Sequence, residues 1–228
     1  MVSRCIEAAG LKDGERLLDA GCGFGGTLGL IHQQFPKSQL TGLNIDERQI
    51  EFTRSRLPAS ARDRIKLFCG DACQLPFEAE SFDVIVALEL LCHLDDAPRF
   101  FSEARRTLKP DGRLIVADHV VSTMAKSAAK GVDLVFGSLF ARLYGRLNCT
   151  RTIRDFITIA KAEGLDTATF ESVTRHTLPN YRFLRRMMRG FDIPFAEKRL
   201  NDVISLTMEA SARIGAFGYA LMKFDKSD

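Results

Sequence analysis

A glycine-rich run in the sequence, Asp19-Ala-Gly21-Cys-Gly23-Phe-Gly25-Gly26, follows directly on a short apolar segment. Glycine has no Cβ atom, so such a run lets the backbone turn tightly and come close to a ligand. The spacing Gly21-x-Gly23-x-x-Gly26 also matches the loops that bind dinucleotides after the first strand of an α/β domain. The run therefore predicts a site for a nucleotide-like cofactor.

Three polar residues bear on which cofactor this loop holds. Asp19 precedes the first glycine by two residues, where a dinucleotide fold would bring its negative charge towards a pyrophosphate. Asn44 lies about 20 residues further on, where a polar side chain can hydrogen-bond to the ribose of either kind of cofactor. Asp71, in Gly70-Asp71-Ala-Cys-Gln-Leu-Pro-Phe77, is expected on the adenine side of the crevice. S-adenosylmethionine suits these acids, because it has no phosphate and carries a sulfonium and an ammonium group.

Candidates for the chemistry follow the expected fourth and fifth strands. Glu89 and His93 lie in Ala87-Leu-Glu89-Leu-Leu-Cys92-His93, and Asp118 with His119 ends the next strand. An unperturbed histidine has a pKa near ~6.5 and suits the acceptance of a proton from a hydroxyl group. Two other interpretations stay open: Glu89 can bind the ammonium group of the cofactor, and either histidine can be a hydrogen-bonded structural residue.

The elements that must position these residues alternate along the chain. Short β-rich segments and longer amphipathic segments predict βαβ units, a mostly parallel sheet and a Rossmann-like, doubly wound α/β fold. The turn at residues 109–112 is expected to precede the fifth strand. The expected strands are residues 16–20, 39–44, 65–68, 82–88, 113–117, 167–173 and 217–224, and the expected helices are residues 26–35, a helix capped by Asp46 before Pro58, 96–108 and 152–163.

Two longer stretches, residues 120–149 and 175–216, do not fit the alternation and have a helical pattern. Long insertions in such folds usually cover a functional site, and both follow strands whose carboxyl ends face the ligand crevice. We expect them to be helical cap insertions of a single domain over residues 1–228.

Composition excludes several other classes of protein. The net charge of +3 is too small to indicate a nucleic-acid partner, and no apolar run is long enough for a membrane span. The six cysteines contain no Cys-x-x-Cys pair, which predicts reduced thiols in a cytoplasmic protein and no metal site.

The motifs together resemble class I S-adenosylmethionine-dependent methyltransferases of the ubiquinone/menaquinone and sterol methyltransferase type. Leu17-Leu-Asp-Ala-Gly-Cys-Gly-Phe-Gly-Gly is similar to the first motif of that family, and Gly70-Asp-Ala-x-x-Leu-Pro-Phe to its adenine motif. Ser81-Phe-Asp-Val-Ile and Leu108-Lys-Pro-Asp-Gly-Arg-Leu resemble its fourth-strand motif and the turn before its fifth strand.

This resemblance implies S-adenosylmethionine as cofactor and a small-molecule acceptor. The cofactor contacts that it implies are Asp19, Gly21 and Gly23 for the methionine part, Asn44 for the ribose, Gln49 and Leu88 near the cofactor, Asp71 for the adenine amino group, and Ala72 for the adenine ring through its backbone.

The resemblance leaves the reaction open between two subfamilies. The segment with Glu89 and His93 is similar both to sterol C-methyltransferases and to indolocarbazole sugar O-methyltransferases, in which a similar His and Asp pair accepts the substrate proton. We expect O-methylation with His93 as proton acceptor and Asp118 either orienting it or binding the substrate hydroxyl; C- or N-methylation of an apolar substrate is the alternative. The segment before the first strand is too short for the usual lid helices, so we expect an open pocket or one closed by a second subunit of a homodimer.

Overall fold

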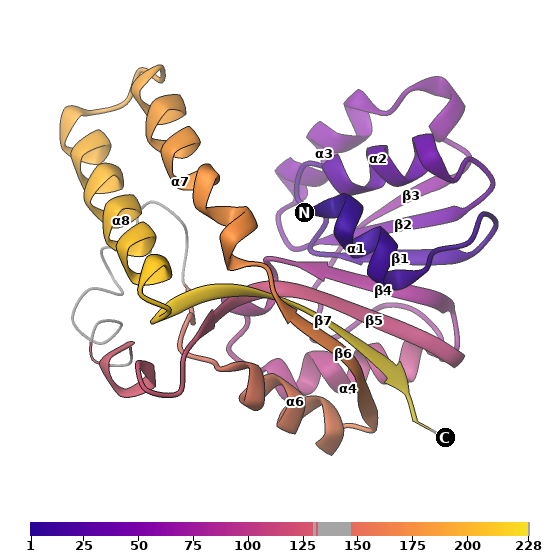
Figure 1. Cartoon of the computed structure of the whole chain (residues 1–228). Coiled ribbons are helices and arrows are strands. Elements are labelled where there is room, and N and C mark those ends of the chain that lie inside the picture. Colours follow the sequence, from indigo (N-terminus) through magenta and orange to yellow (C-terminus); the bar gives the residue numbers. More distant parts are fainter. Residues whose placement is uncertain (130, 132–146, 228) are drawn as a thin grey trace.

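A computed structural model describes residues 1–129, 131 and 147–227 of the chain. Their strands form one sheet in the order β3-β2-β1-β4-β5-β7-β6, in which β7 runs antiparallel to both of its neighbours and the other pairs are parallel (Figure 1). The order reverses between β1 and β4, which is the arrangement of a doubly wound α/β fold. The predicted fold class is therefore confirmed. The strands are β1 Arg16–Ala20, β2 Gln39–Asn44, β3 Ile65–Cys69, β4 Phe82–Leu88, β5 Leu108–Val121, β6 Leu165–Ser172 and β7 Phe217–Lys226.

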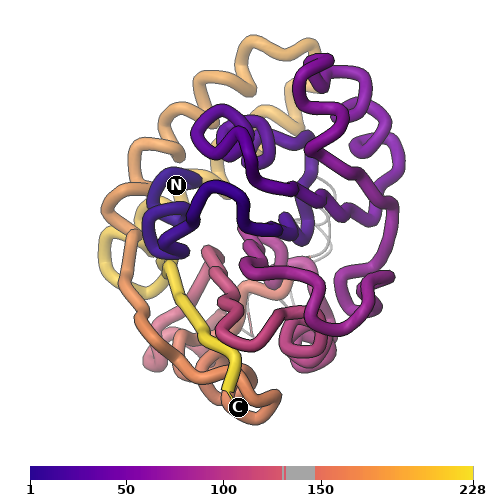
Figure 2. Tube along the Cα trace, turned by 90° about the vertical axis from the view of Figure 1, so that its right-hand side faces the viewer, coloured from indigo at the N-terminus to yellow at the C-terminus, as the bar shows by residue number. Residues whose placement is uncertain are grey.

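Helices cover both faces of the sheet, as Figures 1 and 2 show. Alternate residues of a strand point to opposite faces. Because both faces are covered, the central part of the sheet carries mostly apolar side chains on each face. Leu18 and Ile85 contribute to the core under one set of helices, whereas Leu17 and Val84 contribute to the core under the other. The first core contains residues of α4 Ala97–Thr107 and α6 Ile153–Ala162, and the second contains residues of α1 Val2–Ala9, α2 Gly26–Gln34 and α3 Glu47–Arg56.

Side-chain caps begin three of these helices where the sequence predicts them to begin. Asp46 accepts a hydrogen bond from the backbone N–H of Arg48 at 2.9 Å, and Asp96 accepts one from Arg99 at 3.0 Å. Thr152 and Asp155 bond reciprocally in a capping box at the start of α6. Such caps satisfy amide groups that the first helical turn leaves without an intrahelical partner.

The structure departs from the prediction at β5, β6 and α1. β5 extends from Leu108 to Val121, because its pairing with β4 begins at Leu108, skips the predicted turn and resumes at Arg113. β6 begins at Leu165, earlier than predicted. Helix α1 was not predicted; it packs against β5 and β7, and Cys5, Ile6 and Ala9 are buried there.

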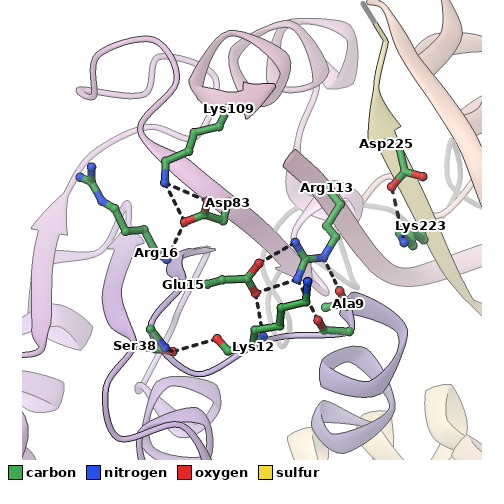
Figure 3. A network of polar contacts seen from close by, with 12 residues as sticks. Ala9, Lys12, Glu15, Arg16, Ser38, Asp83, Lys109, Arg113, Lys223 and Asp225 are labelled. Carbon is green, nitrogen blue, oxygen red and sulfur yellow. Dashed lines mark hydrogen bonds and ion pairs between the residues drawn. The ribbon is translucent and has the colours of Figure 1, made fainter. Parts of the chain in front are cut away.

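A charged network ties α1 and the amino ends of the strands together, away from the glycine loop. Figure 3 shows the Arg113 guanidinium between the carboxylate of Glu15, at 2.8 Å, and the carbonyl oxygen of Ala9. Beside it Lys109 donates to Asp83 at 2.8 Å. This network stabilises the sheet at the end opposite to the glycine loop.

The segment between β6 and β7 forms two antiparallel helices, α7 Thr174–Arg189 and α8 Phe195–Arg213, which stand off the end of the sheet (Figure 1). Arg185 of α7 donates to Glu209 of α8 at 2.7 Å and to Ser205 at 3.0 Å. Most of the other predicted cap, residues 120–149, lies outside the described residues.

Candidate active site

The glycine loop lies at the carboxyl end of β1 and is held against β2. The backbone N–H groups of Gly21 and Cys22 both donate to the carbonyl of Leu43, at 2.8 and 3.0 Å. Gly21 has a φ of 80°, and a Cβ atom there would lie 3.0 Å from Leu90. A side chain at this position would therefore be strained and would press on the loop that follows β4.

Asn44 and Gln49 bracket the loop from the neighbouring strand and helix. Asn44 accepts a hydrogen bond from the backbone N–H of Gly23 at 3.3 Å and donates to the Gln49 side chain at 3.2 Å. The structure thus brings together Gly21, Gly23, Asn44 and Gln49, four of the residues that the sequence predicts at the cofactor.

Asp19 lies within β1 next to this loop and is almost completely buried, with 2% of its surface exposed. Its Oδ2 atom is buried and has no hydrogen-bond partner. Burial raises the pKa of the Asp19 carboxyl from 3.8 to about 7. A buried acid without a partner is costly, and a nearby cation would offset that cost. The ammonium and sulfonium groups of S-adenosylmethionine are cations of this kind, so the residues present fit that cofactor.

The segment after β3 carries the residues predicted at the adenine. Gly70 donates to the carbonyl of Asn44 at 3.0 Å, which joins this segment to the end of β2. Asp71 is exposed and its Oδ1 atom accepts from the backbone N–H of Cys73 at 2.8 Å, whereas Ala72 is buried at 5% exposure. One carboxylate oxygen of Asp71 thus orders the turn, and we predict that the other accepts from the adenine amino group.

Replacing Asp71 by Ala is expected to weaken binding of S-adenosylmethionine by roughly 0.5–1.5 kcal/mol, or more if the hydrogen bond is charge-assisted. Isothermal titration calorimetry measures this loss. Asp71→Asn is the matched control for the turn, because it keeps an acceptor for the Cys73 amide. Unchanged affinity in Asp71→Ala would move the adenine away from this segment.

Glu89 directly follows β4 and has a left-handed backbone, with a φ of 52°. Its backbone N–H donates to the carbonyl of Ala117 at 2.8 Å. Its carboxylate accepts from the hydroxyl of Tyr219 at 3.2 Å, and that hydroxyl also lies 3.0 Å from the Ala117 carbonyl. Burial, followed by the negative charge of Glu89, raises the pKa of Tyr219, which therefore keeps its proton. A left-handed non-glycine residue is strained, and such strain concentrates at functional sites.

His93 ends a short 3-10 helix, η2 Leu91–His93, and its side chain is exposed to a cavity. Arg151 holds this segment, because its guanidinium donates to the carbonyls of Leu91 at 2.7 Å and Leu94 at 2.8 Å. Arg151 is half-buried and about 60 residues away along the chain, so no local sequence pattern indicates this role.

Asp118 and His119 lie on opposite sides of β5. Asp118 is fully buried, where it accepts from the backbone N–H groups of Cys92 at 3.1 Å and His119 at 2.7 Å, and burial raises its pKa. His119 lines the cavity and stacks on Phe217, with ring centroids 5.2 Å apart. The structure therefore does not bring the Asp118 carboxylate to the cavity wall beside His93. It gives Asp118 an indirect contact, through the residue that precedes His93.

The cavity has a volume of about 760 Å³ and lies between the carboxyl ends of β4 and β5 and the α7–α8 pair. Its sheet side carries Glu89, His93, His119 and Tyr219, and most of its remaining described lining is apolar. Leu88, which the sequence places near the cofactor, is half-buried at the carboxyl end of β4 and packs against the core under α1–α3; it does not line this cavity. The sequence interpretation missed Tyr219, because its neighbour Glu89 is 130 residues away.

Two exclusions hold within the described parts of the chain. No group of three or more His, Cys, Asp or Glu side chains there is arranged to hold a metal ion. None of the helices in the same ranges combines the length and apolarity that crossing a membrane requires.

Residues 18–116 match the family described as Methyltransferase domain. The methyltransferase GfsG from Streptomyces halstedii is 28% identical over 180 residues, which cover 78% of this chain and 63% of that protein. The 27-O-demethylrifamycin SV methyltransferase from Amycolatopsis mediterranei is 28% identical over 227 residues, or 96% of this chain and 79% of that protein. The sterol 24-C-methyltransferase ERG6B from Gibberella zeae is 39% identical over 106 residues, which cover 45% of this chain and 27% of that protein.

Solved structures share the fold over almost the whole chain. The geranyl diphosphate C-methyltransferase from Streptomyces coelicolor has a TM-score of 0.77 at 21% identity, covering 99% of this chain and 78% of that one. The phosphoethanolamine N-methyltransferase 2 from Haemonchus contortus has a TM-score of 0.80 at 20% identity, covering 100% of this chain and 52% of that one. The [4+2]-cyclase SpnF has a TM-score of 0.78 at 20% identity, covering 99% of this chain and 80% of that one, so the same fold also carries a different named activity.

Residues 18–116 thus match a methyltransferase domain, and the fold and the glycine loop with its buried acid agree with that match. Two of the solved structures of this fold hold S-adenosylmethionine or S-adenosylhomocysteine, and the buried Asp19 carboxyl beside the glycine loop fits a cofactor of this kind.

Proposed function

We propose that this protein methylates an oxygen atom of a small natural-product-like acceptor that enters the 760 Å³ cavity. The observation that carries the proposal is the position of this cavity. The cavity reaches Glu89 and His93, which follow the carboxyl end of β4. β4 pairs with β1, the strand that leads into the glycine loop. A cavity of this size suits a drug-sized molecule.

In this mechanism the residues at the glycine loop hold the cofactor and those of η2 receive the acceptor. When bound, S-adenosylmethionine supplies an electrophilic methyl group whose leaving group is a neutral thioether, so in-line placement accounts for much of the rate. His93 accepts the proton that the acceptor hydroxyl loses. Asp118 acts as a positioning residue, because its carboxylate binds the Cys92 amide next to His93.

Two observations favour oxygen over carbon as the acceptor atom. Two histidines, His93 and His119, line the cavity and can take a proton, which methyl transfer to an alkene carbon does not need at the same step. The relative named for 27-O-demethylrifamycin SV also aligns with almost the whole of this chain, whereas the sterol C-methyltransferase aligns with less than half of it. C- or N-methylation of an apolar substrate remains the alternative, and Glu89 is the residue that would serve it.

The test is incubation of the protein with S-adenosylmethionine and matched acceptors, hydroxylated and olefinic, with detection of S-adenosylhomocysteine and of the methylated product. We expect a mass gain of one methyl group on an oxygen atom, located by NMR. A methyl group on carbon or nitrogen would contradict the O-directed proposal. Cofactor binding without S-adenosylhomocysteine formation across an extract-wide screen would indicate a non-catalytic cofactor-binding protein.

Glu89→Gln separates the two reactions, because it keeps the shape of the side chain and removes its charge. For an O-methyltransferase that uses His93, we expect activity to persist in Glu89→Gln. For a C-methyltransferase we expect turnover to be abolished, because methyl addition to an alkene leaves a carbocation that a carboxylate stabilises electrostatically. The measurement is kcat for each product, with Tyr219→Phe as a control that keeps the Glu89 charge but removes the hydroxyl bound to it.

A further inference from the structure

Charge is distributed unevenly around the cavity. Glu89 contributes the single carboxylate among the described lining residues, and none of those residues is a lysine or an arginine. The helix side, from α7 and α8, combines neutral and apolar groups. Its members are Thr177, Asn180, Tyr181, Phe183, Leu184, Ile204, Ser205, Thr207, Met208 and Ser211.

Two arginines beside this lining are already engaged. Arg185 reaches Ser205, a lining residue, but its other nitrogen is bound to Glu209 at 2.7 Å, and its side chain is 13% exposed. Arg151 donates to the backbone carbonyls of Leu91 and Leu94. Moving either guanidinium towards a ligand would break these part-buried hydrogen bonds and leave their acceptors without a partner.

Among the described lining residues, an anionic acceptor would therefore meet the carboxylate of Glu89 and no lysine or arginine. Burial of an unpaired anion costs several kcal/mol, and a like charge nearby adds to that cost. A divalent metal ion could offset the charge, but the described residues include no cluster of His, Cys, Asp or Glu that would hold one.

We infer that the acceptor is an uncharged amphiphile: its polar group lies at Glu89, His93 and His119, its apolar body lies against α7 and α8, and the described lining disfavours phosphate, diphosphate and carboxylate compounds. This inference rests on the proposed function and names the substrate class of the same cavity. It separates this chain from two proteins of the same fold, whose names and bound ligands include geranyl diphosphate and a phosphorylated ethanolamine.

The test compares geraniol with geranyl diphosphate, which share one hydrocarbon chain and differ in charge. The sequence contains no tryptophan and three tyrosines, of which Tyr181 and Tyr219 line the cavity, so tyrosine fluorescence reports its occupation without a label. We expect geraniol to bind at least about tenfold more tightly than geranyl diphosphate, with or without Mg²⁺. Equal or tighter binding of the diphosphate, or no binding of geraniol, would overturn the inference.

Met208→Lys places a cation in the lining, and Met208→Leu is its uncharged control. We expect Met208→Lys to gain about tenfold or more in affinity for geranyl diphosphate and to lose affinity for geraniol, while Met208→Leu retains the original order. An unchanged order of the two ligands in Met208→Lys would contradict the inference. Binding is measured without S-adenosylmethionine, so a failure of methyl transfer in the acceptor assay is a separate result that bears on the proposed function alone.

Discussion

His93→Ala is expected to lower kcat by about 10²- to 10⁴-fold, which is the usual contribution of a positioned acid or base. His93 lines the cavity from η2, and Arg151 holds that segment through the carbonyls of Leu91 and Leu94. Because the proposed role of His93 is to contact the acceptor and not the cofactor, the affinity for S-adenosylmethionine should remain nearly unchanged. Steady-state kinetics with the identified acceptor and calorimetric titration of the cofactor measure the two quantities.

The second cavity histidine provides a matched comparison for this variant. His119 also lines the cavity, but its ring stacks on Phe217 and meets Tyr219 edge-on at 5.1 Å between centroids. We expect His119→Ala to change KM more than kcat, because His119 forms part of the cavity wall and does not act as the base. Equal losses of rate and cofactor affinity in His93→Ala would show a structural role, and a small effect on kcat would favour the C-methyltransferase alternative.

Asp19→Asn is expected to weaken S-adenosylmethionine binding and at the same time to stabilise the protein without ligand. The Oδ2 atom of Asp19 is buried without a partner beside the glycine loop. If it meets a cationic group of the cofactor, loss of its charge removes an interaction of about 1.5–3 kcal/mol, or roughly 10- to 150-fold in affinity. Calorimetric titration of the wild type and the variant measures this loss.

The stability effect has the opposite sign and depends on pH. Burial raises the pKa of Asp19 from 3.8 to about 7, so between these values the folded state retains a proton that the unfolded state has released. The contribution of Asp19 to the free energy of unfolding therefore falls as the pH rises through this window. Above pH 7 the variant should be more stable than the wild type by on the order of 2–4 kcal/mol, and at about pH 4 the difference should vanish.

Urea unfolding of both proteins at several pH values, without cofactor, tests this dependence. In the wild type the affinity for S-adenosylmethionine should also rise as the pH approaches and passes 7, because the ionised carboxyl is the binding form, whereas in Asp19→Asn it should stay flat. A stability difference that does not vary with pH would show that Asp19 has a partner in solution. A normal affinity in the variant would place the cationic groups of the cofactor elsewhere.

Local patterns in the sequence predicted the sheet, most of the helices and the glycine loop. The glycine loop and the caps at Asp46, Asp96 and Thr152 depend on contacts within a few residues, and the structure has them where the sequence indicates. The nearly all-apolar run of β4 identified a central strand, because a strand covered on both faces needs apolar side chains at almost every position.

Local sequence patterns predicted less of the acceptor cavity. Asp118 and His119 are adjacent in the sequence and both are polar, so their types alone do not show which one faces a ligand. Successive side chains of a strand point to opposite faces, and the antiparallel pairing with β7 places Asp118 inside and His119 beside Phe217. Tyr219 reaches Glu89 only because β7 inserts between β5 and β6.

The sequence by itself thus determined the class of fold, the cofactor loop and the segment that carries Glu89 and His93, since each is encoded by the spacing of neighbouring residues. The tertiary structure alone decided which polar groups share the cavity, how Arg151 and Asp118 hold η2, and that α7 and α8 line the cavity without a described cation. These features arise from contacts between residues that are 26 to 130 positions apart. No local pattern in the sequence indicates which of such distant residues meet in the folded protein.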